Sequence, residues 1–177
     1  MALSQESLYA LLDDVPDYQA FLTVDEMRAS SQQLADDYPD VVSLITLGAS
    51  RGGTPIEALK IGDGEKVGFM VGLPHPNEPI GAMMLEYLAR KLAEDDALRE
   101  SLGYTWYLIK AIDIDGTRLN EGWVKGPFTV TNYAREFYRP PSQHQVEWTF
   151  PVSYKTYEFN EPLPETQAWM QLIEQHP

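Results

Sequence analysis

The sequence predicts an α/β fold in which helices cover both faces of a mixed β-sheet. Short apolar and β-branched runs, typical of buried strands, alternate with longer segments whose apolar residues recur at helical spacing. Turn residues rich in glycine and proline separate these runs. A chain of 177 residues is long enough to bury a core of its own, so we interpret residues 1–177 as a single domain.

The first half of the chain gives clear signals for where each element begins and ends. Thr23-Val-Asp-Glu26 has the spacing of a capping box, which begins a helix, and Pro39 ends it. β-branched and apolar residues predict the first two strands, which we expect to pair as an antiparallel hairpin. The expected elements, in chain order, are helices over 6–12 and 23–38, strands over 41–47, 55–61 and 67–71, a helix over 81–93, a strand over 104–112 and a helix over 164–175.

The middle of the chain predicts one strand followed directly by a helix. Asp63-Gly64 is interpreted as a hairpin turn that leads into the strand over 67–71. Apolar residues at helical spacing predict the helix over 81–93, and Pro79 suits its first turn. The residues that follow, 94–100, are expected to form an acidic surface segment.

Residues 117–162 differ from the rest of the chain in composition. They contain half of its aromatic residues and several prolines, with little helical periodicity. A loop of this length in a compact domain is usually functional or disordered, and the aromatic content argues against disorder. We interpret the region as a long, ordered loop over a functional site. A second patch of hydrophobic core is the alternative.

The stretch between the strand over 67–71 and the following helix has the residues for metal chemistry. It reads Gly-Leu-Pro-His75-Pro-Asn-Glu78-Pro, so an imidazole and a carboxylate stand three residues apart on a bend made stiff by prolines. Zinc binds histidine nitrogen and carboxylate oxygen, and a catalytic zinc usually has three protein ligands and a water. The spacing therefore supplies two ligands of three. The alternative is a polar loop whose histidine binds a backbone carbonyl.

Charge and composition exclude several classes of partner. With 13 Lys and Arg against 27 Asp and Glu, the net charge is −14, which disfavours nucleic acids and anionic membranes. The absence of cysteine excludes disulfides and thiolate metal sites. The first residues lack the basic and apolar regions of a signal peptide, and no apolar run is long enough to span a bilayer. We therefore expect a cytoplasmic protein.

Four segments in order resemble the zinc metallocarboxypeptidases related to carboxypeptidase A. The stretch around His75 and Glu78 is similar to the first metal motif of that family, a His-x-x-Glu after a strand. The other three are similar to a Gly-x-Ser-x-x-Gly-x-x-Ile turn, an Asn-Pro-Asp-Gly segment and a Pro-Glu-Thr that opens a helix. They read Gly48-Ala-Ser-Arg-Gly-Gly-Thr-Pro-Ile56, Asp113-Ile-Asp-Gly116 and Pro164-Glu-Thr-Gln-Ala168.

The resemblance implies a three-layer α/β fold with one zinc ion at the carboxyl ends of the strands, and it covers only the N-terminal part of the catalytic domain. It also implies hydrolysis of the C-terminal peptide bond of a peptide substrate. His75 and Glu78 match the first two metal ligands. The residues expected to bind substrate, all from segments near the family's arginine positions, are Arg135, Asn132, Arg118 and Arg139.

The sequence departs from the family pattern at several positions. Asn77 stands where the family often has arginine, and Ala134 replaces an asparagine that binds substrate. The third metal ligand and the catalytic glutamate have no counterpart, since His176 ends the last helix before any strand. His144-Gln-Val-Glu147 repeats the His-x-x-Glu spacing without matching a family motif, and we interpret it as chance. The chain alone is expected to bind zinc weakly and not to hydrolyse peptides.

Two further expectations concern partners and competing functions. Because the family builds its central sheet from both halves of the domain, a strand edge should lie bare here, and bare edges pair with other strands. We therefore expect a homodimer, or a partner segment, at that edge. The alternatives to a carboxypeptidase-like hydrolase are a non-catalytic binding or assembly module on the same fold, and a deacylase of N-acyl amino acids.

Overall fold

The structure of the protein is a computed structural model that describes residues 4–176. Residues 1–3 and Pro177 lie outside the described range. The expectation that the chain has no signal peptide rests partly on residues 1–3. The helices are α1 (Gln5–Asp13), α2 (Val24–Asp37), α3 (Ile80–Glu94), α4 (Asp96–Leu102), α5 (Ile114–Leu119), α6 (Glu121–Val124), α7 (Val130–Glu136) and α8 (Pro164–Glu174). The strands are β1 (Val42–Ala49), β2 (Pro55–Ile61), β3 (Lys66–Val71), β4 (Tyr104–Ile109), β5 (Val152–Tyr154) and β6 (Tyr157–Phe159).

A mixed sheet of four strands in the order β1-β2-β4-β3 is the centre of the fold. β1 and β2 form the expected antiparallel pair, with Val42 opposite Ile61. β4 pairs antiparallel with β2 and parallel with β3, where Val67 lies opposite Thr105. β1 and β3 are therefore the two edges of the sheet, and the carboxyl ends of β3 and β4 lie side by side.

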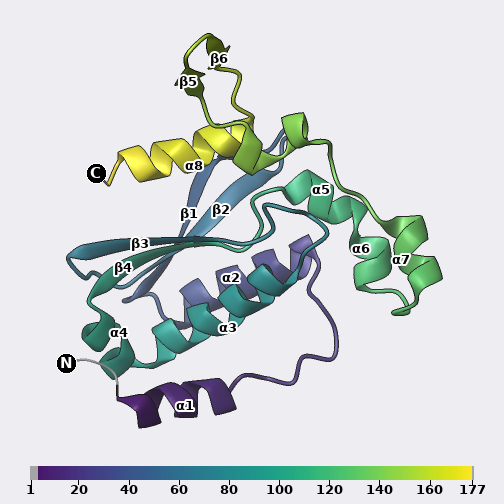
Figure 1. Ribbon diagram of the computed structural model, residues 1–177. Coiled ribbons are helices and arrows are strands. Elements are labelled where there is room, and N and C mark those ends of the chain that lie inside the picture. Colours follow the sequence, from purple (N-terminus) through teal and green to yellow (C-terminus); the bar gives the residue numbers. More distant parts are fainter. Residues whose placement is uncertain (1–3, 177) are drawn as a thin grey trace.

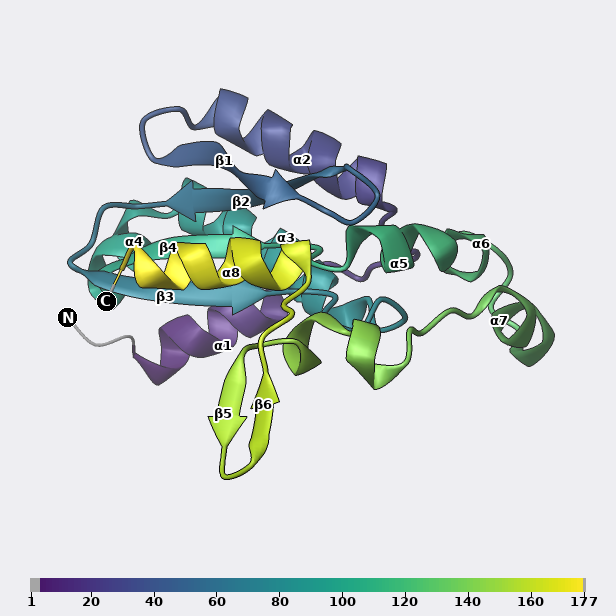
Figure 2. The ribbon, with the colours of Figure 1, turned by 90° about the horizontal axis from the view of Figure 1, so that it is seen from above.

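Helices cover both faces of the sheet, which confirms the predicted fold class. Figure 1 shows α2 and α3 on one face and α8 on the other, while α5, α6 and α7 extend beyond the carboxyl ends of β3 and β4. Seen from above, α8 lies over the sheet and runs along β3 and β4, and the β5–β6 hairpin projects away from the sheet (Figure 2). α1 lies outside α3, and the Tyr87 hydroxyl of α3 donates a hydrogen bond to the Leu11 carbonyl of α1.

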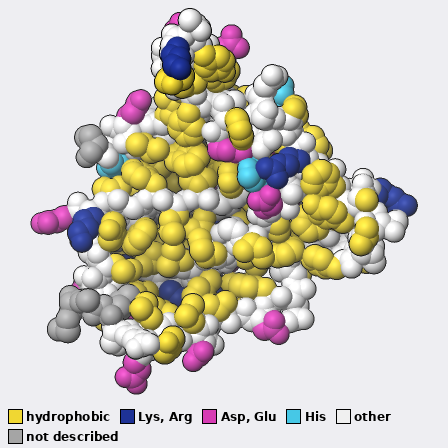
Figure 3. Space-filling model, viewed as in Figure 1, with side chains coloured by type: hydrophobic (Ala, Val, Ile, Leu, Met, Phe, Trp, Pro, Cys, Tyr) yellow, Lys and Arg dark blue, Asp and Glu magenta, His cyan; other side chains and the backbone are white. Residues whose placement is uncertain are grey.

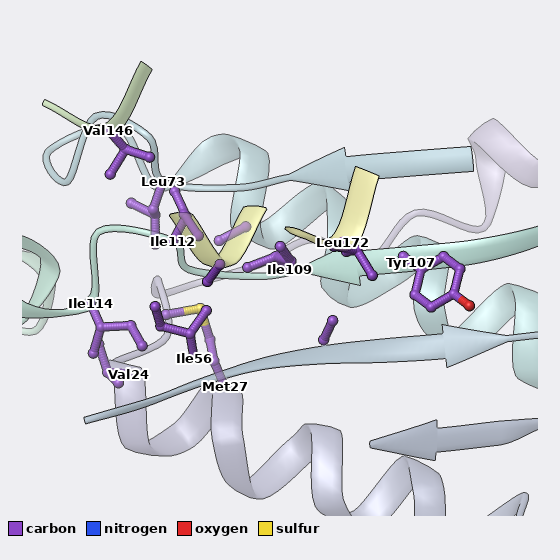
Figure 4. Close-up of a cluster of buried hydrophobic side chains, with 13 residues drawn as sticks. Val24, Met27, Ile56, Leu73, Tyr107, Ile109, Ile112, Ile114, Val146 and Leu172 are labelled. Carbon is purple, nitrogen blue, oxygen red and sulfur yellow. The ribbon is translucent and has the colours of Figure 1, made fainter. Parts of the chain in front are cut away.

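Two hydrophobic clusters hold the layers together. One lies between the sheet, α8 and the amino end of α2, and it extends to Leu73, Ile112 and Val146 in the loops beyond the strands (Figure 4). The other joins α3 and α4 to the opposite face of the sheet through residues such as Leu85 and Leu108. The loops that follow β3 and β4 are thus fixed by the same core that holds the strands.

The predicted hairpin turn at Asp63-Gly64 was wrong. β2 and β3 are not hydrogen-bonded to each other, because β4 lies between them. Gly64 instead allows the backbone of the β2–β3 connection to approach β4 closely: a Cβ atom there would lie 2.3 Å from the carbonyl carbon of Gly103. A glycine in a short connection therefore indicated a close backbone contact here, not a two-residue turn.

Two segments contain more helix than the sequence predicted. Asp95 caps the helix α4, where an acidic surface segment was expected, and its carboxylate accepts a hydrogen bond from Leu98 N at 2.9 Å. The expected loop over 117–162 contains the short helices α6 and α7 and the β5–β6 hairpin. Buried Asn120 connects α5, α6 and the segment after α7: its side chain donates to Gly116 O and Tyr138 O and accepts from Tyr138 N and Trp123 Nε1. Helical periodicity is hard to detect in segments this short.

The side of the molecule viewed in Figure 1 has a large apolar area on its surface. Figure 3 shows hydrophobic side chains gathered over α3, β3 and α8 on the side viewed in Figure 1. The exposed apolar side chains of these elements include Ile80 (68% exposed) and Met84 (48%) on α3 and Ile173 (39%) on α8. Within residues 4–176, no helix has the length and apolar character needed to cross a membrane.

Candidate metal site

The loop that follows β3 is held in one position by the loop that follows β4. Gly72 N donates to Ile109 O at 2.8 Å, and Ile112 N donates to Gly72 O at 3.1 Å. A side chain at position 72 would meet the Lys110 carbonyl, since a Cβ there would lie 2.4 Å from that oxygen. Buried Leu73 has a φ of 52°, a left-handed value that non-glycine residues seldom adopt. This bend turns the chain out of the sheet and places His75 above the carboxyl end of β3.

His75 lies between two carboxylates. Its Nδ1 is 2.9 Å from Glu78 Oε2, and its Nε2 is 2.7 Å from Glu147 Oε1. The side chains of His75 and Glu147 are 28% and 27% exposed, whereas Glu78 is 55% exposed. The hydrogen bond to His75 is the main reason that the pKa of Glu78 is lowered, and the charge of Arg139 acts in the same direction.

Arg139 binds the second oxygen of Glu78. Its Nη1 lies 2.9 Å from Glu78 Oε1, and its Nη2 donates to Gln145 Oε1 at 3.4 Å. Gln145 is buried and is itself fixed by a 2.9 Å hydrogen bond from its Nε2 to Pro140 O. The segment 139–149 therefore contacts the His75 loop twice, through Arg139 on Glu78 and through Glu147 on His75.

The donor atoms around His75 suit a zinc ion. A histidine nitrogen and a carboxylate oxygen at 2.9 Å face each other from one rigid loop, and both types of ligand are ordinary for zinc. Two buried acceptor atoms of the same neighbourhood, Asn77 Oδ1 and Glu147 Oε2, receive no hydrogen bond from the residues described. Within residues 4–176, no three histidine or carboxylate side chains are placed so that all three could hold one metal ion, and Glu147 contacts the opposite ring nitrogen of His75 from Glu78. The described residues thus supply a pair of ligands.

The other residues expected to bind substrate do not gather at His75. Arg118 forms an ion pair with Asp25 of α2, with Nη2 and Oδ1 2.6 Å apart. Arg135 and Asn132 lie on α7. The backbone N–H of Asn132 donates a hydrogen bond to Thr129 Oγ1, which caps the start of this helix. Of the four residues, Arg139 is the one that contacts the His75 loop, through its hydrogen bond to Glu78.

Several aromatic residues of 117–162 cluster together with Phe21 from before α2. Trp123 packs edge-on against Phe21, Phe128 and Tyr133, with ring centroids 5.0 to 6.3 Å apart. These side chains lie around α6 and α7, and the part of the region that reaches the His75 loop is the segment 139–149.

A second polar cluster connects three of the four segments that carry the family resemblance. Arg51, in the β1–β2 turn, contacts Asp113 Oδ1 at 3.1 Å and Glu165 Oε1 at 3.2 Å. Its Nη1 also donates to the His144 carbonyl at 3.2 Å. Both carboxylates are fully buried, and burial raises the pKa of Asp113 to about 6 although Gly116 N and Arg51 favour its charged form. Arg51 therefore holds the β1–β2 turn, the start of α5 and the start of α8 together.

Sequence reasoning identified the His75–Glu78 pair but not Glu147. The two residues of the pair are three positions apart, so a local pattern found them. Glu147 reaches His75 from 72 residues further along the chain, and no pattern in the sequence connects them. The His144–Glu147 spacing was interpreted as chance; His144 is exposed, and Glu147 bonds His75.

Comparison with known proteins gives matches along most of the chain. The family model described as "Zinc carboxypeptidase" matches residues 27–177. A carboxypeptidase B of the crayfish Astacus astacus is 27% identical over 105 residues, which is 56% of this chain and 35% of that protein. The crystal structure of a carboxypeptidase A from Helicoverpa armigera has a TM-score of 0.67 at 19% identity and covers 97% of this chain. A metallo-carboxypeptidase from Burkholderia cenocepacia covers 99% of this chain with a TM-score of 0.54 at 20% identity.

The chain spans about half the length of these proteins or less. It covers 50% of the Helicoverpa armigera chain, 39% of the Burkholderia cenocepacia chain and 35% of the crayfish protein. The likeness to the solved structures supports the three-layer arrangement of sheet and helices.

Proposed function

This chain belongs to the zinc carboxypeptidase family, and on that premise we propose that it forms the zinc-binding part of a hydrolase that removes C-terminal residues from peptides. The observation that supports this best is the convergence of His75 Nδ1 and Glu78 Oε2 at the carboxyl end of β3. A bound zinc ion would polarise the scissile carbonyl and lower the pKa of a water.

Each residue of the site has a role in this proposal. His75 and Glu78 would hold the ion through nitrogen and oxygen. Glu147 accepts a hydrogen bond from the opposite nitrogen of His75, which fixes the ring and its tautomer. Arg139 has the planar pair of donors that suits a substrate carboxylate, and it lies at the site. Arg118, Arg135 and Asn132 remain candidates for substrate binding on neighbouring elements.

We further propose that this chain by itself binds zinc weakly and does not turn over peptides. Two ligands leave a zinc ion open to solvent, and the part of the chain that the structure describes gathers no third one. A C-terminal peptide substrate with added zinc is therefore expected to give no detectable hydrolysis. Zinc-dependent turnover by the purified chain would contradict this part of the proposal.

Zinc affinity, measured by competition with a chromophoric chelator, tests the metal pair directly. His75→Ala should abolish the specific binding that the wild-type chain shows. His144→Ala is the matched control, because His144 is exposed and lies outside the pair, and it should leave the affinity unchanged. Equal affinity of the wild-type and His75→Ala chains would show that zinc binds elsewhere.

A non-catalytic binding or assembly module is the second candidate, and the exposed edge of β3 is the observation that favours it. β3 is the last strand of the sheet on that side, and the apolar face of Figure 3 lies around it. On either candidate function we propose that the β3 edge pairs with a further strand, with a homodimer as the simplest case.

A further inference from the structure

Two neighbouring side chains, Arg139 and His75, contact the carboxylate of Glu78. Its Oε1 is bonded by Arg139 and its Oε2 by His75, so both oxygens already have a partner. The side chains involved are partly exposed, with Arg139 33% and Glu78 55% accessible to solvent. A cation that approaches the pair therefore meets a carboxylate whose charge a guanidinium already balances.

We infer that Arg139 competes with the metal ion for Glu78, so that the Arg139–Glu78 ion pair lowers the zinc affinity of this chain. The inference rests on the proposed metal role of His75 and Glu78 and adds a regulation of that site. A divalent ion on Glu78 would lie within a few ångströms of the guanidinium, and like charges at that range repel by roughly 1–2 kcal/mol even in water. Release of Arg139 removes this repulsion.

The contact of Glu147 with His75, made by the same segment, should instead raise the zinc affinity. Glu147 carries negative charge and accepts from His75 Nε2 at 2.7 Å, an arrangement that makes the other nitrogen a better ligand. Segment 139–149 thus contributes one residue that weakens cation binding and one that strengthens it. The Arg139–Glu78 and Glu147–His75 contacts both hold segment 139–149 against the His75 loop. If their role were only structural, removing either contact would therefore change the zinc affinity in the same direction.

The experiment compares the zinc affinity of four variants with that of the wild-type chain, by chelator competition at fixed ionic strength. Arg139→Gln should bind zinc about tenfold more tightly. Arg139→Lys, which keeps the charge, should stay close to the wild-type affinity. Glu147→Gln should bind about tenfold more weakly. Arg28→Gln is the matched control: Arg28 is 36% exposed, close to the 33% of Arg139, and its carboxylate partner Glu57 lies on β2 away from His75, so its affinity should be unchanged.

Each outcome decides between distinct explanations. If Arg139→Gln binds zinc as tightly as the wild-type chain or less tightly, the competition is overturned while the His75–Glu78 site stands. If Arg139→Gln and Glu147→Gln both weaken binding, the segment only holds the loop in place and the competition is again overturned. If neither the wild-type chain nor Arg139→Gln binds zinc, both the metal site and the competition fail.

A second measurement follows the segment itself. Zinc should increase the hydrogen exchange of amides in residues 142–147 of the wild-type chain, because Arg139 leaves Glu78 and its bond to Gln145 loses its anchor. The same addition should change the exchange of Arg139→Gln less. Unchanged exchange in the wild-type chain at saturating zinc would contradict the release of Arg139.

Discussion

At the scale of single residues, the molecule depends on a few charged side chains that are placed by distant parts of the chain. Arg51 lies between Asp113 and Glu165, both of which are fully buried. Asp113 Oδ2 and Glu165 Oε2 have no hydrogen-bond partner among the described residues. The guanidinium of Arg51 is therefore the ion-pair partner of two buried carboxylates, and the contribution of this cluster to stability should depend on pH.

Asp113→Asn should remove a pH dependence of stability. The pKa of Asp113 is about 6 in the folded chain and near 3.8 when unfolded, so the folded state binds more protons between these values. The free energy of unfolding should therefore fall as the pH rises from 4 to 7, by roughly 3 kcal/mol from this residue. Urea unfolding of the wild-type chain and of Asp113→Asn at several pH values measures the difference.

The control for this prediction is Asp63→Asn, which removes an exposed carboxylate from the β2–β3 connection. Its stability profile should follow that of the wild-type chain. A parallel profile for Asp113→Asn would show that the pKa of Asp113 is not raised by folding.

At the scale of elements, local signals explain where helices begin, and non-local pairing explains the sheet. The Thr23–Glu26 capping box is complete: Glu26 N donates to Thr23 Oγ1 at 3.2 Å and Thr23 N donates to Glu26 Oε2 at 2.8 Å. The first three strands were also predicted closely, since each is a short run rich in apolar and β-branched residues next to turn residues. The neighbours of β3 were not predictable, because its partner β4 begins more than thirty residues later and no local rule connects them.

Thr23→Ala should lower the free energy of unfolding by about 1 kcal/mol, the usual cost of losing an N-cap side chain. Ser4→Ala provides the comparison, because Ser4 caps α1 in the same way but α1 has no buried residue. Loss of that cap should loosen α1 locally and change global stability by less than about 0.5 kcal/mol. Equal effects of the two substitutions would show that capping energy alone, without packing, determines the outcome.

At the scale of the whole molecule, the sequence and its family resemblance predicted the layers and half of the candidate site. Helices on both faces of a mixed sheet followed from alternating patterns, and the His75–Glu78 pair followed from one motif. Glu147 and the Arg51 cluster could not be predicted, because each depends on how the loops beyond the sheet fold back over one another. The free edge of β3 is a further property of the whole sheet.

We predict that the chain forms a dimer through this edge. β3 has neither proline nor charge between Val67 and Val71, so it lacks the features that usually prevent edge pairing. Light scattering coupled to size-exclusion chromatography should give twice the monomer mass, and higher salt should strengthen the dimer because it screens the charge of −14 on each copy. A monomer at all salt concentrations would contradict the prediction.

Substitutions on the apolar face locate the contact. Ile80→Lys combined with Met84→Lys places charges on exposed positions of α3, so the fold should persist while the dimer dissociates. Leu119→Lys is the matched control, since Leu119 is 58% exposed on α5, away from β3, and it should leave the dimer intact. Dissociation by both variants would indicate a different interface.

The position of β4 between β2 and β3 also constrains the order of assembly during folding. β1 and β2 are joined by a short turn and can pair as soon as they are synthesised, but β3 has no neighbour until the two intervening helices and β4 have followed. Closing that crossover is entropically slow. Pulse labelling should therefore find the amides of the β1–β2 hairpin protected before those of the parallel pair β3 and β4. In the chain during synthesis, β3 should stay unpaired until β4 has been made.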